Sequence, residues 1–195
     1  DLDVIVGSFG WRTTGNVTLL ENRTTDWKTP RFTPTVVDPR TGAIHVPVVD
    51  LNKDGKPDFV VLLAQQHESV IAFVNTGKGL AFTPQVVYEA PHPNWGSSGI
   101  DLVDLDKDGD MDVLLTHGDT FDDFVLKPYH GIIWLENTGT FPFTAHHLAT
   151  LPGALDPAAV VICEASSFQL EDTVAFAPHA AVVVDLAPRH LHRQG

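Results

Sequence analysis

The feature that most constrains this chain is an internal repeat with a period of about 54 residues. A segment that ends in aspartate and leads into an apolar run occurs three times, and its aspartates, Asp3, Asp58 and Asp112, lie 55 and 54 residues apart. Two further landmarks follow each copy in the same order. The first is a segment ending in asparagine, at Asn22, Asn75 and Asn137, and the second begins with Phe-Thr, at Phe32, Phe82 and Phe143. Such a period indicates one structural unit per repeat.

Each repeat contains about four runs of strand-forming residues. In the second repeat they cover residues 44–51, 58–64, 69–75 and 83–89. Residues 59–63 are continuously apolar, which is typical of a strand covered on both faces. A β-sandwich also uses short strands, but it gives no reason for the repetition. The pattern therefore predicts an all-β fold, a partial β-propeller with blades of about 54 residues and four antiparallel strands.

The repeats divide the chain into a partial blade over residues 1–38, blades over 44–90 and 98–150, and an atypical tail over 151–195. The first repeat starts at its second strand, so we expect a longer parent chain that supplies the remaining blades and an upstream signal. The tail has nine alanines, against seven in the first 150 residues, and lacks the aspartate loop expected near residue 158. We interpret it as a degenerate blade or a non-native end.

Two acidic loops, residues 50–58 and 104–112, share the pattern D-x-[DN]-x-D-G-x-x-D. Oxygen-bearing side chains at every second position can surround one hard cation, and the glycine permits a sharp turn. An EF-hand begins in the same way, but it closes with glutamate at the twelfth position and is flanked by helices. The loops predict about two calcium sites, with the second tighter because it is more acidic. An Asx-rich turn without metal is the alternative.

These loops, followed by the strands at 58–62 and 112–115, resemble FG-GAP/VCBS repeats, which also build the propeller of integrin α subunits. The resemblance covers about residues 1–150. It implies a β-propeller with calcium in the hairpin between the first two strands of a blade, and ligand binding on the opposite face. The implied calcium ligands are Asp50, Asn52, Asp54, Lys56 (carbonyl), Asp58, Asp104, Asp106, Asp108, Asp110 (carbonyl) and Asp112.

The third repeat has an insertion after its second strand, on the side away from the acidic loops. Long loops on rigid scaffolds tend to carry function. The candidate ligand residues in this insertion are His117, Asp119, Asp122, Asp123, Tyr129 and His130. The alternative is an ordered loop that packs against the next blade. Trp95, just before the third repeat, is expected to pack between blades rather than to stack on a sugar.

The formal net charge of −13 argues against nucleic acid as a partner, because such a surface repels phosphate. No apolar run approaches the length of a membrane span. We find no nucleophile elbow, HExxH motif, phosphate loop or zinc spacing, so we expect no enzyme.

The function expected from these observations is a noncatalytic, calcium-binding recognition or adhesion module of a secreted or cell-surface protein. Its location would be extracellular, periplasmic or at the cell surface, and its partner a protein or a glycan. Two alternatives stay open: a lectin-like propeller that binds carbohydrate, and a scaffold fragment of a secreted polysaccharide-active enzyme.

Overall fold

The computed structural model describes residues 2–10, 13–65, 67–118 and 130–151, all within one compact unit, Asp1–Leu155. This part of the chain contains strands and no helix, which confirms the predicted all-β class. Within it, accordingly, no helix has the length and apolar character needed to cross a membrane. The tail predicted to be atypical lies outside the described residues from position 152 onward.

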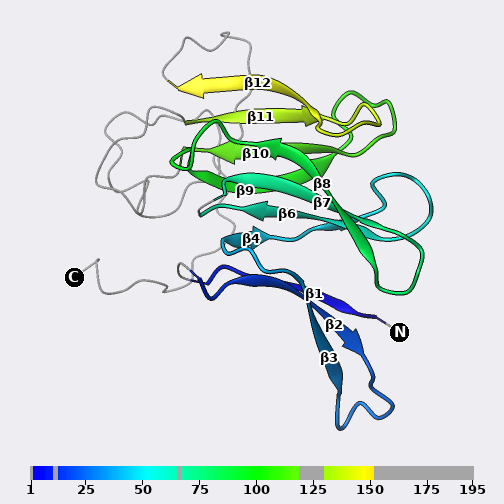
Figure 1. Ribbon diagram of the computed structural model, residues 1–195. Helices are drawn as coiled ribbons and strands as arrows, with labels where there is room; N and C mark the ends of the chain where they lie inside the picture. Colours follow the sequence, from blue (N-terminus) through cyan, green and yellow to red (C-terminus); the bar gives the residue numbers. More distant parts are fainter. Residues whose placement is uncertain (1, 11–12, 66, 119–129, 152–195) are drawn as a thin grey trace. The chain divides into compact units, whose positions relative to one another are not determined.

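The strands form three antiparallel sheets (Figure 1). The first sheet has the order β1 (Val4–Ser8), β2 (Asn16–Asn22) and β3 (Phe32–Asp38). The second has the order β4 (Ala43–His45), β6 (Asp58–Leu63), β7 (Ser69–Asn75) and β8 (Phe82–Glu89), with β5 (Val48–Val49) also on β6. The third has the order β12 (Thr144–Leu151), β11 (His130–Glu136), β10 (Asp112–His117) and β9 (Ser97–Val103). Each repeat therefore forms one sheet, and closure into a ring stays a prediction.

The strand content differs from the prediction in the second sheet. The third sheet has the four predicted strands, and the first has three among the described residues, as expected for a repeat that starts at its second strand. The second sheet has five because its expected first strand, 44–51, is divided into β4 and β5. Pro47 lies at the division and has no N–H to donate to the ladder, which explains the interruption. Its carbonyl still accepts the N–H of Val60 at 3.0 Å, so β5 remains beside β6.

The second sheet is covered on both faces, as the apolar run at 59–63 predicts. All six residues of β6 are buried. Successive side chains of a strand point to opposite faces. Accordingly, Phe59, Val61 and Leu63 pack toward the first sheet, and Val60 and Leu62 pack toward the third. Full burial of an aliphatic or aromatic side chain of this size contributes about 1.5–3 kcal/mol.

Aromatic rings fill the core between the first two sheets. Phe59 stacks on Phe73 with ring centroids 4.7 Å apart, and the edge of Phe82 meets Phe59 at 4.9 Å. Val17 of β2 closes this core from the first sheet. The stack is a cross-strand pair, because Phe59 and Phe73 lie opposite each other in the β6–β7 register.

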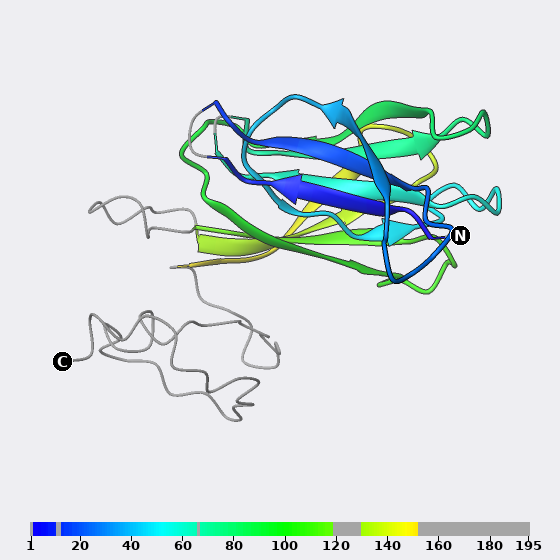
Figure 2. The same ribbon diagram turned by 90° about the horizontal axis from the view of Figure 1, so that it is seen from below.

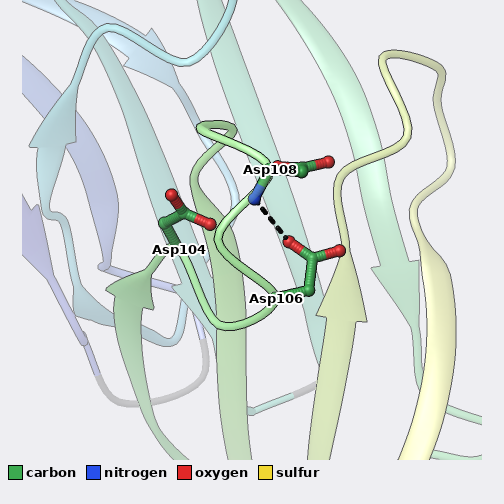
Figure 3. A group of neighbouring side chains, drawn as sticks. All are labelled: Asp104, Asp106 and Asp108. Atoms are coloured by element: carbon green, nitrogen blue, oxygen red, sulfur yellow. Dashed lines mark hydrogen bonds between the residues drawn. The ribbon is translucent and has the colours of Figure 1, made fainter.

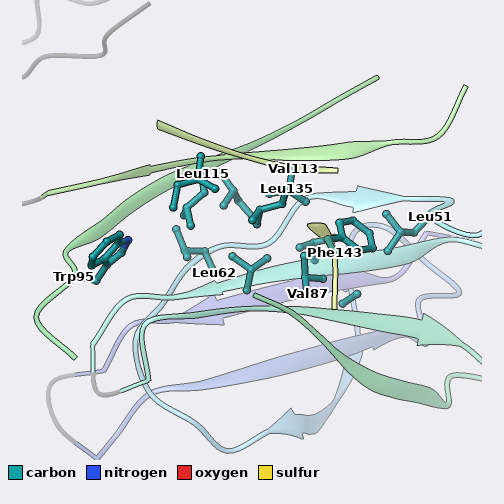
Figure 4. Close-up of a cluster of buried hydrophobic side chains, with 13 residues drawn as sticks. Leu51, Leu62, Val87, Trp95, Val113, Leu115, Leu135 and Phe143 are labelled. Atoms are coloured by element: carbon teal, nitrogen blue, oxygen red, sulfur yellow. The ribbon is translucent and has the colours of Figure 1, made fainter. Parts of the chain in front are cut away.

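A second core joins the second and third sheets (Figure 4). Val113, Leu115 and Leu135 enter it from the third sheet. The N–H of Phe143, just before β12, also donates to the carbonyl of Val87 in β8 at 3.0 Å, which links the two repeats. Trp95 is buried in this core, so the expectation that it packs between repeats is confirmed.

Candidate metal centre

The two acidic loops join the same pair of strands in successive sheets. Residues 50–57 lead from β5 into β6, and residues 104–111 lead from β9 into β10. Both loops project from the end of the sheets at which β1 begins (Figures 1 and 2). The hairpins are therefore repeated in position as well as in sequence.

The predicted glycine turns are confirmed by the backbone. Gly55 and Gly109 have φ angles of 81° and 93°, which residues with a side chain rarely adopt. Lys53 and Lys107, two residues earlier in each loop, also have positive φ, at 58° and 66°. The same sequence of conformations in both loops shows that they curl in the same way.

The second loop brings three carboxylates together (Figure 3). Asp104, Asp106 and Asp108 each place one carboxylate oxygen within 4.8 Å of the others. Backbone amides hold these side chains: Gly109 donates to Asp104 at 3.0 Å, and Asp108 donates to Asp106 at 3.2 Å. The loop thus fixes three acidic groups around one point.

The carboxylates of the second loop repel one another. The backbone amide of Asp108 donates to Asp106 and works against a rise in its pKa. Desolvation and the negative charges of Asp108, Asp112 and Asp104 outweigh this bond, so the pKa of Asp106 is raised above its usual 3.8. A bound cation would remove this repulsion.

The donor set of the second loop fits a hard cation. Its aspartate side chains offer only oxygen, and calcium accepts six to eight oxygen ligands in flexible geometry. Asp112, the implied closing ligand, is buried, and its two oxygens accept the N–H groups of Leu105 at 3.1 Å and Asn137 at 2.9 Å. A carboxylate oxygen has a further lone pair, so these bonds leave capacity for a metal.

The first loop contains a cation of its own. The Nζ of Lys56 lies 2.8 Å from Oδ2 of Asp54, and this bond is the main reason that the pKa of Asp54 is lowered from 3.8. Asp50 accepts the N–H groups of Asp54 at 3.1 Å and Gly55 at 2.9 Å. Asn52 brings an amide in place of a carboxylate. The first loop therefore presents less free negative charge than the second.

The closing aspartates have a structural partner that the sequence analysis did not assign. In each repeat the Oδ1 of the aspartate accepts the N–H of the landmark asparagine, in the pairs Asp3–Asn22 at 2.8 Å, Asp58–Asn75 at 2.7 Å and Asp112–Asn137 at 2.9 Å. The recurrence of these asparagines at the same place in each repeat is the sequence signal from which this partner could have been predicted. We call each pair an Asp–Asn clamp.

The asparagine side chain completes each clamp. Its Nδ2 donates to the carbonyl that precedes the aspartate, in Leu2 at 3.1 Å, Pro57 at 3.2 Å and Met111 at 3.2 Å. The clamp closes the end of the sheet because it ties the beginning of one strand to the end of the next, with each residue in the strand or directly beside it. The three clamps repeat the same chemistry.

The comparison with family models agrees with this geometry. Residues 50–115 match the model of the FG-GAP-like repeat. This chain contains an FG-GAP-like repeat. The matched segment begins at the first acidic loop and extends past the second into β10. A search of curated proteins gives no match, and neither does a search of solved structures.

The candidate ligand loop follows the FG-GAP-like repeat. Asp119, Asp122, Asp123 and Tyr129 lie outside the described residues. His117 is buried at the end of β10 and stacks on Trp95 with ring centroids 4.6 Å apart, so its ring packs inward. His130 is half-buried at the start of β11. The ligand role of this loop stays a prediction.

Proposed function

We propose that the chain is part of a calcium-stabilised β-propeller that serves as a noncatalytic recognition or adhesion module of a secreted or cell-surface protein. The observation that carries this proposal is the convergence of Asp104, Asp106 and Asp108 in a loop that is built twice in the same way. The FG-GAP-like repeat supports it. Calcium would supply positive charge where three carboxylates repel one another.

The role proposed for calcium is structural. The acidic loops connect the first strand of a sheet to the strand that starts at a closing aspartate. Neutralising the acidic residues would hold the hairpin in the conformation that Gly55 or Gly109 permits. The proposed ligands are those implied by the resemblance, with a tighter site in the second loop because Lys56 already pairs with Asp54 in the first.

The propeller is proposed from the way the sheets pack. The second sheet buries one face against the first sheet and the other against the third. Stacking of this kind continues from sheet to sheet, and further repeats of a parent chain would complete a ring. The partner in recognition would be a protein or a glycan, and the location extracellular, periplasmic or at the cell surface.

A calcium titration of the full chain tests the proposal. We expect two calcium-selective sites by calorimetry, in the sub-millimolar to millimolar range of extracellular modules, and little response to magnesium. Asp106→Asn should weaken the tighter site. Asp101→Asn is the matched control, since it removes one carboxylate from an exposed position of β9 in the same sheet.

Two results would count against the proposal. One is the absence of calcium-dependent heat from a sample whose circular dichroism shows folded β-structure. The other is an equal loss of affinity in Asp106→Asn and Asp101→Asn, because the loop would then act only through net charge.

A further inference from the structure

A lysine of the first acidic loop reaches into the second. The Nζ of Lys53 lies 2.6 Å from Oδ1 of Asp110, and the two side chains are 55% and 32% exposed. Lys53 has a φ of 58°, so its backbone adopts an unfavourable conformation in the turn that carries this contact. The contact joins two repeats, whereas the pair of Lys56 and Asp54 stays within one.

The ammonium group of Lys53 lies against the acidic turn itself. A Cβ atom built on Gly109 would be 3.4 Å from Nζ. The hydrogen bond to Asp110 is the main cause of the raised pKa of Lys53. Desolvation opposes it, and attraction to Asp110, Asp108 and Asp104 adds to the rise. Two of the three converging carboxylates therefore act on this one cation.

We propose that Lys53 is a built-in counter-cation that links the two loops and sets the cation affinity of the second one. The inference deepens the proposed calcium function and rests on it. Without calcium, the ammonium offsets part of the repulsion among the carboxylates and keeps the loops together. With calcium, the same positive charge lowers the affinity of the second loop, because it reduces the negative potential that the incoming ion meets.

Lys107 provides a matched comparison within the chain. It occupies the position of Lys53 in the second loop and also has positive φ, at 66°. Among the residues that the structure describes, Lys107 forms no ion pair. Removing its charge therefore measures the effect of net charge near the carboxylates, without the contact that Lys53 makes.

The test compares Lys53→Met with Lys107→Met in the full chain. We expect Lys53→Met to bind calcium in the second loop roughly three- to tenfold more tightly at low ionic strength, with a smaller gain for Lys107→Met. The difference should shrink in about 1 M salt, where screening is strong. Equal gains in the two variants, or no gain in Lys53→Met, would overturn the affinity role.

Thermal unfolding in EDTA tests the link without calcium. Lys53→Met should lower Tm by about 1–2 °C, while in an Asp110→Asn background the same substitution should have a clearly smaller effect. Asp110→Asn keeps the backbone carbonyl that is the implied ligand. An undiminished effect of Lys53→Met in that background would overturn the link.

The calcium titrations and the unfolding measurements in EDTA together distinguish failure of the inference about Lys53 from failure of the proposed calcium function. If the wild-type chain binds no calcium, the proposed function is wrong and the affinity role falls with it. The link between the loops is then decided by the unfolding cycle in EDTA alone. If calcium binds as expected and the variants behave alike, only the role of Lys53 is wrong.

Discussion

Asp58 accepts the N–H of Asn75 through one carboxylate oxygen at 2.7 Å and the N–H of Leu51 through the other at 2.9 Å. Its carboxylate is fully buried. One side chain therefore ties together the acidic loop, the start of β6 and the end of β7. This arrangement means that the closing aspartate stabilises the repeat even without a metal.

Replacing Asp58 with alanine should destabilise the chain by about 2–5 kcal/mol, because the buried N–H of Leu51 and the partly buried N–H of Asn75 lose a charged acceptor. Urea unfolding in EDTA measures this effect without any contribution from calcium. Asp101→Ala, at an exposed position of β9, should change the free energy of unfolding by no more than about 0.5 kcal/mol. If the two variants unfold at the same urea concentration, the clamp has no stabilising role.

Replacing Phe73 with alanine should cost about 3–5 kcal/mol, because it leaves a cavity beside Phe59 in the core between the first two sheets. Phe32→Ala is the control, since Phe32 is exposed at the start of β3. The free energies of unfolding of both variants, measured by chemical denaturation, test this prediction. A cost for Phe73→Ala as small as that for Phe32→Ala would contradict the packing described here.

Replacing Gly55 with alanine should destabilise the first loop by about 1–2 kcal/mol through the backbone alone. An added Cβ at this position meets nothing within 4 Å, so no steric clash contributes. Gly55→Asn should cost less, because asparagine tolerates positive φ better than alanine. Thermal unfolding in EDTA shows which of the two variants is more stable. A lower stability of Gly55→Asn than of Gly55→Ala would count against the backbone explanation.

Asp38 and Arg40 form an ion pair whose contribution depends on pH. Burial of Asp38 acts to raise its pKa, but the hydrogen bonds and charge of Arg40 outweigh it and lower the pKa below 3.8. A lowered pKa in the folded state means that the stabilisation is complete above the unfolded value. It is lost as pH falls through the lower, folded value.

The wild-type chain should therefore lose stability relative to Asp38→Asn as pH falls below about 4. At neutral pH the variant should be less stable by about 1–3 kcal/mol, since Arg40 keeps its charge and loses a partner at 2.6 Å. Unfolding free energies measured from pH 7 to pH 3 give the comparison. A difference that does not depend on pH would show that the charge of Asp38 is unimportant.

Some elements could be predicted from sequence because they depend on local pattern. The continuous apolar run at 59–63 predicted a strand buried on both faces, and Gly55 and Gly109 predicted sharp turns. The division of the first strand at Pro47 had a local signal as well, since proline interrupts a ladder, but the surrounding β-forming residues outweighed it.

Other contacts could not be predicted because they depend on register and on packing between repeats. The clamp between Asp58 and Asn75 spans 17 residues and requires the exact alignment of β6 with β7. The contact between Lys53 and Asp110 requires two loops from different sheets to lie side by side. Neither distance follows from composition or spacing in one repeat.

The packing of β6 also bears on how a chain of this kind can evolve. Val60 and Val61 are neighbours in sequence but belong to different cores, so the strand is under two selective constraints at once. Insertion or deletion of one residue within β6 would exchange its two faces and damage both cores. Duplication of a whole period preserves both surfaces. Length changes should therefore accumulate as entire repeats or in the connecting loops, and substitutions in β6 should be rare and compensated in both neighbours.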